Sequence, residues 1–269
     1  MPKTKASAKS KPSGKSTPSQ AHTATKHQSA PKRIGTARSF LERFNTNIAI
    51  GSLFAELVGT FGLTALVLST NGNPVVAAVA VMIFVIVFGK LSGAHINPAV
   101  TIALLTVRRI SALRGAGYIV AQLIGSMLAL IVIAQFASAA PPVVNPETDQ
   151  LITRSVFEVP ALVGTWTPFF AEMLGSLILG LGIAAVTFVK REGLESGFAV
   201  GGALMLGLFL AMQGSAAVLN PAVALGLDAF TSDLWTYSVY AFAPVIGVTA
   251  GVMLFRLLQL DVKEETKSA

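Results

Sequence analysis

The chain has 269 residues, of which 53% are hydrophobic and only 12% are charged, and its mean hydropathy is +0.68. This composition excludes an ordinary soluble domain, in which about a quarter of the residues are charged. The absence of cysteine excludes disulfides, cysteine metal sites and thiol chemistry. Several apolar runs have about 18 to 24 residues, enough to cross a bilayer core about 30 Å thick. The composition therefore indicates an integral membrane protein.

The first 45 residues differ from the rest of the chain. They hold ten of the twenty Lys and Arg residues and a single acid, Glu42. They are also rich in Ser, Pro and Gly and cannot bury a core, so residues 1–45 are predicted to be a disordered tail. No apolar segment follows the early lysines, so this tail is not a signal peptide. Attraction to anionic lipid at the cytoplasmic face is favoured over nucleic-acid binding.

Six apolar runs predict transmembrane helices, near residues 48–70, 75–92, 112–135, 166–189, 197–213 and 235–259. The connections after the second and fourth runs are basic, through Arg108, Arg109, Arg114, Lys190 and Arg191. The opposite connections are acidic, with Glu147, Asp149, Glu158, Asp228 and Asp233 against Arg154. The positive-inside rule then places both termini in the cytoplasm, with residues 261–269 as a second tail. We expect the protein in the plasma membrane.

Three short sequences occur twice, in the same order. FAELVGT at 54–60 returns as FAEMLGS at 170–176, HINPAVT at 95–101 as VLNPAVA at 218–224, and QLIG at 122–125 as PVIG at 244–247. Residues 46–260 are therefore predicted to be one domain with homologous halves, 46–135 and 166–260. Each half has three spans, an odd number, so the halves enter the membrane from opposite sides. Such an inverted repeat builds a site near the bilayer midplane, between its halves.

The repeated Asn-Pro-Ala motif predicts two half-helices. Its residues are Asn97, Pro98 and Ala99 in the first half and Asn220, Pro221 and Ala222 in the second. Asn is a strong N-cap, Pro suits the first helical position, and about ten further residues make about 15 Å of helix, half a bilayer. The half-helices would meet at their N-termini, where each Asn turns its two amide donors outward and the positive helix ends repel cations. The irregular backbone before each motif must line a water-filled cavity, with its carbonyls as acceptors.

These motifs, SGAHINPAVT at 92–101, LNPA at 219–222 and the two FAE segments, resemble the major intrinsic protein family of aquaporins and glycerol facilitators over about residues 46–260. The resemblance implies an all-α membrane protein, a right-handed bundle of six transmembrane helices and two re-entrant half-helices. It implies a homotetramer with one pore in each subunit. It also implies a passive channel for water and small neutral solutes such as glycerol-like polyols, with no enzymatic activity, cofactor or metal.

Three polar residues accompany the motifs. Glu56 and Glu172 are intramembrane carboxylates at matching positions of the repeat. They are candidate proton carriers, but the resemblance favours a supporting role in which they accept hydrogen bonds from the backbone of the re-entrant loops. His95 is expected to pack in the first loop beside Ser92, in preference to gating the cytoplasmic mouth by pH.

The family's selectivity ring maps by spacing to Ala77, Leu208, Ala217 and Val223. The family usually has Arg at the fourth position, so this chain lacks a fixed charge and five donors there. Two outcomes compete: a wide apolar ring that passes solutes such as glycerol, or a hydrophobic constriction of Leu208 and Val223 that dewets and slows water. The small side chains at 77 and 217 favour the wide pore.

Three rival functions fit the sequence less well. A secondary transporter also uses inverted repeats, but only Glu56 and Glu172 are available to bind its coupling ion. An intramembrane protease needs Ser and His placed for nucleophilic catalysis, and His95 is three residues from Ser92 with no acid to orient it. A structural membrane protein with a closed pore stays open as an alternative.

Overall fold

The structure is a computed structural model that describes residues 49–144, 151–152, 155–162 and 166–268. The predicted tail of residues 1–45 lies outside the described residues. The long helical segments are α2 (Ile50–Ser69), α3 (Pro74–Phe88), α5 (Ala112–Ala139), α6 (Thr167–Val189), α7 (Leu194–Ala211), and a last one made of α9 (Leu234–Tyr237), the π-helix η1 (Ser238–Phe242) and α10 (Ala243–Ser268). The short helices are α4 (Pro98–Thr106) and α8 (Pro221–Gly226).

These elements confirm the predicted fold class of six spans and two half-helices. Five segments have the length and hydropathy to cross a membrane, and α3 is a shorter apolar helix of 15 residues. The prediction carried the second span to residue 92, but α3 ends at Phe88 because the chain turns there into the first re-entrant loop. Outside the bundle, the described residues include one short antiparallel ladder that was not predicted, between β1 (Val143–Val144) and β2 (Leu151–Ile152).

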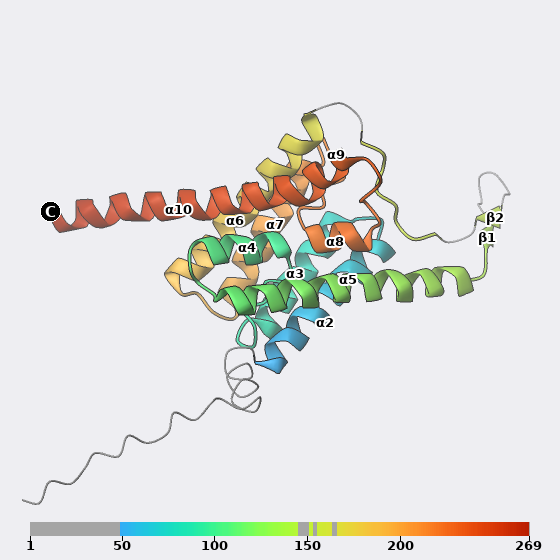
Figure 1. Cartoon of the computed structure of the whole chain (residues 1–269), viewed down its shortest axis with the longest axis horizontal. Helices are drawn as coiled ribbons and strands as arrows, with labels where there is room; N and C mark the ends of the chain where they lie inside the picture. Colours follow the sequence, from blue (N-terminus) through green and yellow to red (C-terminus); the bar gives the residue numbers. More distant parts are fainter. Residues whose placement is uncertain (1–48, 145–150, 153–154, 163–165, 269) are drawn as a thin grey trace, which may run out of the picture.

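The two halves interlock through their short helices. Figure 1 shows α4 and α8 lying between α10 and α5. The half-helix α4 packs against α10 of the second half as well as against α5, and α8 packs against α5 and α2 of the first half. Helices α3 and α7 also join the halves. Each half-helix is therefore held largely by the other half of the chain, which brings the two Asn-Pro-Ala motifs together in the centre.

Small residues at equivalent positions let the helices approach closely within each half. A Cβ at Gly125 would overlap the Leu57 carbonyl of α2, and a Cβ at Gly247 would overlap the Met173 carbonyl of α6. These two contacts join α2 to α5 and α6 to α10, the equivalent pairs of the repeat. Close backbone approach through glycine is a common basis of helix association in lipid, where apolar burial gives little driving force.

The last helix extends beyond the predicted membrane span. That span was predicted to end near residue 259, followed by a tail of residues 261–269, and α10 continues as a helix through this segment to Ser268. This segment contains no Pro or Gly and consists mostly of residues that tolerate a helix well. The helix therefore outlasts the apolar run, because hydropathy limits the membrane span and not the secondary structure.

Candidate pore

Both half-helices begin with the cap that the sequence predicts. Asn97 Oδ1 accepts a hydrogen bond from the Ala99 N–H at 2.8 Å, and Pro98 follows at the first helical position. Asn220 Oδ1 accepts from the Ala222 N–H at 3.0 Å, again with Pro next in the chain. The side chains of the two Asn residues are buried, with 5% and 4% of their surface exposed. The sequence folds in this way because the Asn oxygen satisfies an N–H of the first turn that has no helical partner.

The amide nitrogens of the same two side chains tie the loops together. Asn97 Nδ2 donates to the Leu219 carbonyl and Asn220 Nδ2 donates to the Ile96 carbonyl, each over 2.9 Å. Each acceptor is the residue directly before the opposite Asn, so the contact is reciprocal. The expectation that both N–H bonds of each amide face the pore is therefore wrong, because one of the two is used in this tie. One donor per Asn is left for a permeating molecule.

Unusual backbone geometry precedes each motif. Ala94 and Ile96 have φ values of 49° and 41°, and the equivalent residues Ala217 and Leu219 have 54° and 53°. A non-glycine residue in this left-handed region costs about 1–3 kcal/mol, and the cost is higher for a β-branched residue such as Ile96. The two loops thus place left-handed residues at the same positions relative to their Asn-Pro-Ala motifs. Such a backbone persists only where its surroundings hold it in place.

The first loop is held by the carboxylate of Glu56. Its Oε1 accepts from the His95 N–H at 2.9 Å and from Ser92 Oγ at 2.6 Å, and its Oε2 accepts from the Ile96 N–H at 2.6 Å. Gln122 Nε2 donates to Oε2 as well, at 2.8 Å. Glu56 has no exposed surface. A buried carboxylate with this many donors is well satisfied, and hydrogen bonds to a charged group are the strong class.

The second loop repeats the arrangement around Glu172. Its Oε1 accepts from the Val218 N–H at 2.9 Å and from Ser215 Oγ at 2.8 Å, and its Oε2 accepts from the Leu219 N–H at 2.7 Å. Position 244, which matches Gln122 in the repeat, is Pro, so this carboxylate has no amide donor there. Both glutamates therefore bind the two N–H groups that immediately precede an Asn-Pro-Ala motif.

His95 lies at the inner surface of the first loop. Its Nδ1 is 3.1 Å from Thr101 Oγ1, and its ring packs edge-on against Tyr118 with 5.1 Å between ring centres. Tyr118 in turn donates to the Ser92 carbonyl at 2.8 Å. The imidazole is buried and held by its neighbours, and it also lines the cavity between the halves. His95 therefore packs within the first loop near Ser92, as predicted, and it also lines the cavity.

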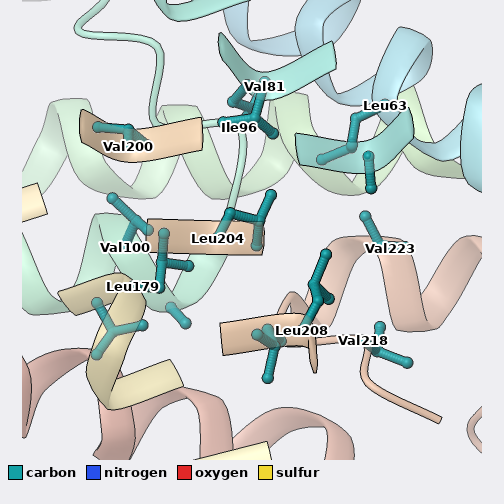
Figure 2. Packing of buried hydrophobic residues seen from close by; sticks show 14 of the residues in the cluster. Leu63, Val81, Ile96, Val100, Leu179, Val200, Leu204, Leu208, Val218 and Val223 are labelled. Carbon is teal, nitrogen blue, oxygen red and sulfur yellow. The ribbon is translucent and has the colours of Figure 1, made fainter. Parts of the chain in front are cut away.

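A single cavity runs between the halves past both motifs. Its lining includes Asn97, Asn220 and the four residues of the predicted ring, Ala77, Leu208, Ala217 and Val223. The wall as a whole is mostly apolar, and all ten side chains labelled in Figure 2 line this cavity. The space open to the centre of a water molecule is about 50 Å³. One water needs at least about 10–15 Å³ of such space, so the cavity accommodates a short file of waters.

The family model described as "Major intrinsic protein" matches residues 73–255. The chain belongs to the major intrinsic protein family. It is 33% identical to Aquaporin NIP3-1 of Arabidopsis thaliana over 80% of this chain and 69% of the relative. It is 31% identical to the Glycerol uptake facilitator protein-like 6 of Lactiplantibacillus plantarum, over 76% of this chain and 96% of the relative.

A solved structure supports the same fold. The X-ray structure of the aquaglyceroporin from Plasmodium falciparum superposes with a TM-score of 0.53, covering 77% of this chain and 93% of that chain at 22% sequence identity. With the family established, the protein is an integral membrane channel for water and small solutes and not an enzyme. The channel function is thus confirmed, and the secondary transporter and closed-pore alternatives are not needed.

Sequence reasoning missed several residues at the pore of this major intrinsic protein. Gln122 and Tyr118 belong to the network of the first loop, and Gln122 was already visible in the repeated QLIG segment. Tyr118 also has an equivalent in Tyr240, at the same offset of 122 as the QLIG repeat, which was a usable signal. Gly72 and Phe157 line the cavity from connecting segments, and no repeat or motif marks them.

Proposed function

We propose that this channel passes small uncharged solutes of the size of glycerol and other short polyols, together with water. The observation that carries the proposal is the composition of the ring: Ala77, Leu208, Ala217 and Val223 line one cavity with both Asn caps, and none of them has a charge or a side-chain donor. The missing Arg removes the bulk and the charge that narrow the pore in most of the family. One relative is a glycerol uptake facilitator by name, which supports the same solute class.

The proposed pore still discriminates against cations. Two helix N-termini meet at the centre, each with partial positive charge, and each Asn has one N–H left for a neutral acceptor. Among the described residues, no Asp or Glu lines the cavity. The loop-supporting carboxylates Glu56 and Glu172 are engaged by the backbone, as described above. Neutral molecules that accept hydrogen bonds are therefore favoured at the motifs.

We infer that the channel domain spans about residues 46–260 and that both termini are cytoplasmic. The Arg109 and Arg256 guanidinium groups lie 4.4 and 5.4 Å from the centre of the Phe188 ring, so basic segments after α4, α6 and within α10 share one end of the bundle. A membrane end rich in Arg and Lys is the cytoplasmic one under the positive-inside rule. The opposite end, where α2 ends and α3 begins, is called the outer mouth below.

We also propose that the channel is a homotetramer in the plasma membrane, with the basic tail of residues 1–45 against anionic lipid. Large apolar side chains on the outside of the bundle, such as Phe54, Val120, Phe198 and Phe242, are more than half exposed in the single chain. An apolar exterior suits lipid or a neighbouring subunit. Family membership supports the tetramer, and the charge of the tail supports the lipid contact.

Topology gives a direct prediction. A cytoplasm-specific reporter fused after Ala269 is expected to be active, and a reporter that works only on the outer side is expected to be silent there. The reason is the even number of spans and the basic end shared by Arg109 and Arg256. A fusion after Ala140, beyond the third span, serves as the control and should give the opposite pattern. Outer-side activity after Ala269 contradicts the proposed orientation.

Val223→Arg tests the proposed solute class. Val223 is 3% exposed and lies within the first turn of α8, so a long side chain there reaches across the outer mouth. The small residues at 77 and 217 leave room, and the loop carbonyls before Asn220 offer partners for the guanidinium. We expect the glycerol-to-water permeability ratio to fall by about tenfold or more, as the pore narrows and gains a fixed charge.

The measurement is stopped-flow permeability in liposomes at equal protein density. Val223→Met is the matched control, because it adds length without charge and should change the ratio less. A ratio that stays constant or rises in Val223→Arg would show that residue 223 does not line the selectivity ring. A wild-type protein that passes water but excludes glycerol would contradict the proposed solute class.

A further inference from the structure

The connection between α5 and α6 returns to the bundle at the outer mouth. The Phe157 N–H donates to the Leu68 carbonyl over 3.2 Å, and Leu68 lies in the last turn of α2. Carbonyls in the last turn of a helix have no partner within the helix, so this bond satisfies one of them. Val156, Val159 and Leu162 are partly buried against the core on either side of Phe157. The segment is therefore anchored by a backbone bond and by apolar contacts.

The turn between α2 and α3 packs directly against the Phe157 ring. Asn71 and Gly72 both have positive φ, 51° and 67°, which is typical of a tight turn. A Cβ at Gly72 would lie 3.0 Å from Phe157 Cε1 and 3.1 Å from Cζ. Glycine is thus required here by its backbone conformation and by the closeness of the ring. The absence of a side chain at 72 lets the ring approach the turn closely.

Phe157 and Gly72 line the same cavity as the ring residues Ala77, Ala217 and Val223. Ala77 lies in the first turn of α3, directly after the turn that contains Gly72, and its N–H donates to the Asn73 carbonyl over 3.0 Å. Among the described residues that line the cavity, Phe157 is the only Phe, Tyr or Trp. The four ring positions hold no aromatic residue, and the aromatic bulk at the mouth therefore comes from a different segment of the chain.

We propose that Phe157 is a further selectivity-determining residue, an aromatic wall of the outer mouth that limits the size of the solutes admitted. The inference rests on the proposed function, since it concerns the same cavity, and it assigns the limiting bulk to the α5–α6 connection. The ring is half-buried, with one side on Gly72 and part of its surface on the cavity. Pore width governs which neutral solutes pass, so removal of the ring opens the mouth.

The test uses the full chain in liposomes with water, glycerol and the larger polyol erythritol. Phe157→Ala is expected to raise the erythritol-to-water permeability ratio by about three- to tenfold, and Phe157→Trp is expected to lower it. The reason is that the width of the pore beside Phe157 limits the size of the solute that can enter. Val156→Ala is the matched control: it loosens the same segment from the core but does not line the cavity. Phe157→Leu keeps apolar bulk for anchoring, should assemble even if the Ala variant does not, and should give an intermediate ratio.

The outcomes separate this inference from the proposed function. Ratios in all three Phe157 variants equal to those of the wild type and Val156→Ala would overturn the role of Phe157 and leave the solute class standing. Equal increases in Phe157→Ala and Val156→Ala would also overturn it, since loosening alone would then explain the change. A wild type that excludes glycerol, together with glycerol flux in Phe157→Ala, would contradict the proposed solute class but support Phe157 as the limit.

Discussion

Asn97→Asp and Asn220→Asp are each expected to reduce neutral-solute flux by about tenfold or more, since a barrier rise of only about 1.4 kcal/mol is sufficient for that factor. The substitution keeps the cap oxygen, so α4 and α8 should still begin at the residue that follows. It removes the amide nitrogen, and with it both the tie to the opposite loop and the donor left for the solute. The expected loss is therefore one of transport and not of the helix start.

The magnitude follows from the surroundings of each Asn. The second oxygen of the new carboxylate would face the Leu219 or Ile96 carbonyl at the position where an N–H now donates over 2.9 Å. Two acceptors at that separation repel each other. A carboxylate near the middle of a bilayer also costs about 2.5–3.5 kcal/mol, and it attracts the cations that the helix ends repel. Both effects act at the point that every solute must pass.

Asn73→Asp is the matched control for this prediction. Asn73 also caps a helix directly before a Pro, with its Oδ1 accepting from the Val75 and Val76 N–H groups at 3.0 and 3.2 Å. It is exposed at the end of the bundle and has no tie to a re-entrant loop. Liposome flux should be near the wild-type value in this variant. Wild-type flux in well-folded Asn97→Asp and Asn220→Asp would show that the two amides do not act on the solute.

Local signals in the sequence predicted the half-helices well. An N-cap, a Pro and a short apolar run act within a few residues, so Asn97 and Asn220 reveal where α4 and α8 begin. The repeat added the relation between the halves, since FAE, Asn-Pro-Ala and QLIG return in the same order. The two glutamates were found because they sit in one of these repeats. Local and repeated features of this kind can be recognised in the sequence without knowledge of the tertiary structure.

Contacts between distant segments were not predictable in the same way. The tie from Asn97 to Leu219 spans 122 residues, and its geometry depends on how the halves pack. Phe157 lies in a connection without periodicity or repeat, so its place at the mouth becomes visible only with the Leu68 carbonyl and Gly72 beside it. The helix α10 extends past the predicted span because hydropathy predicts the edge of the membrane span, while helix propensity continues to Ser268.

Glu56→Gln and Glu172→Gln are expected to lower both thermal stability and flux, because the loops depend on a carboxylate with two acceptor oxygens. Each glutamate accepts two loop N–H groups, one on each oxygen. Glutamine has nearly the same shape but presents an NH₂ group in place of one oxygen. Whichever way the amide turns, one loop N–H then faces another donor and is left buried without a partner. Glutamine therefore keeps the shape of the glutamate side chain but leaves one loop N–H without an acceptor.

The size of the effect follows from comparing the backbone strain of each loop with the free energy of the hydrogen bonds that its glutamate accepts. Two left-handed residues in each loop, such as Ala217 and Leu219, cost about 1–3 kcal/mol each. A hydrogen bond to a charged group contributes about 1.5–3 kcal/mol, so the two backbone bonds to each carboxylate offset roughly that strain. Loss of one bond leaves a buried N–H without an acceptor, so the remaining bonds no longer offset the strain and the loop is expected to change conformation. We therefore expect flux to fall about tenfold or more in either variant, with a lower melting temperature in detergent. Glu158→Gln, at an exposed position of the α5–α6 connection and far in the sequence from both loops, is the control and should change neither quantity. Normal melting and normal flux in both glutamine variants would mean that the loops keep their conformation without the carboxylates.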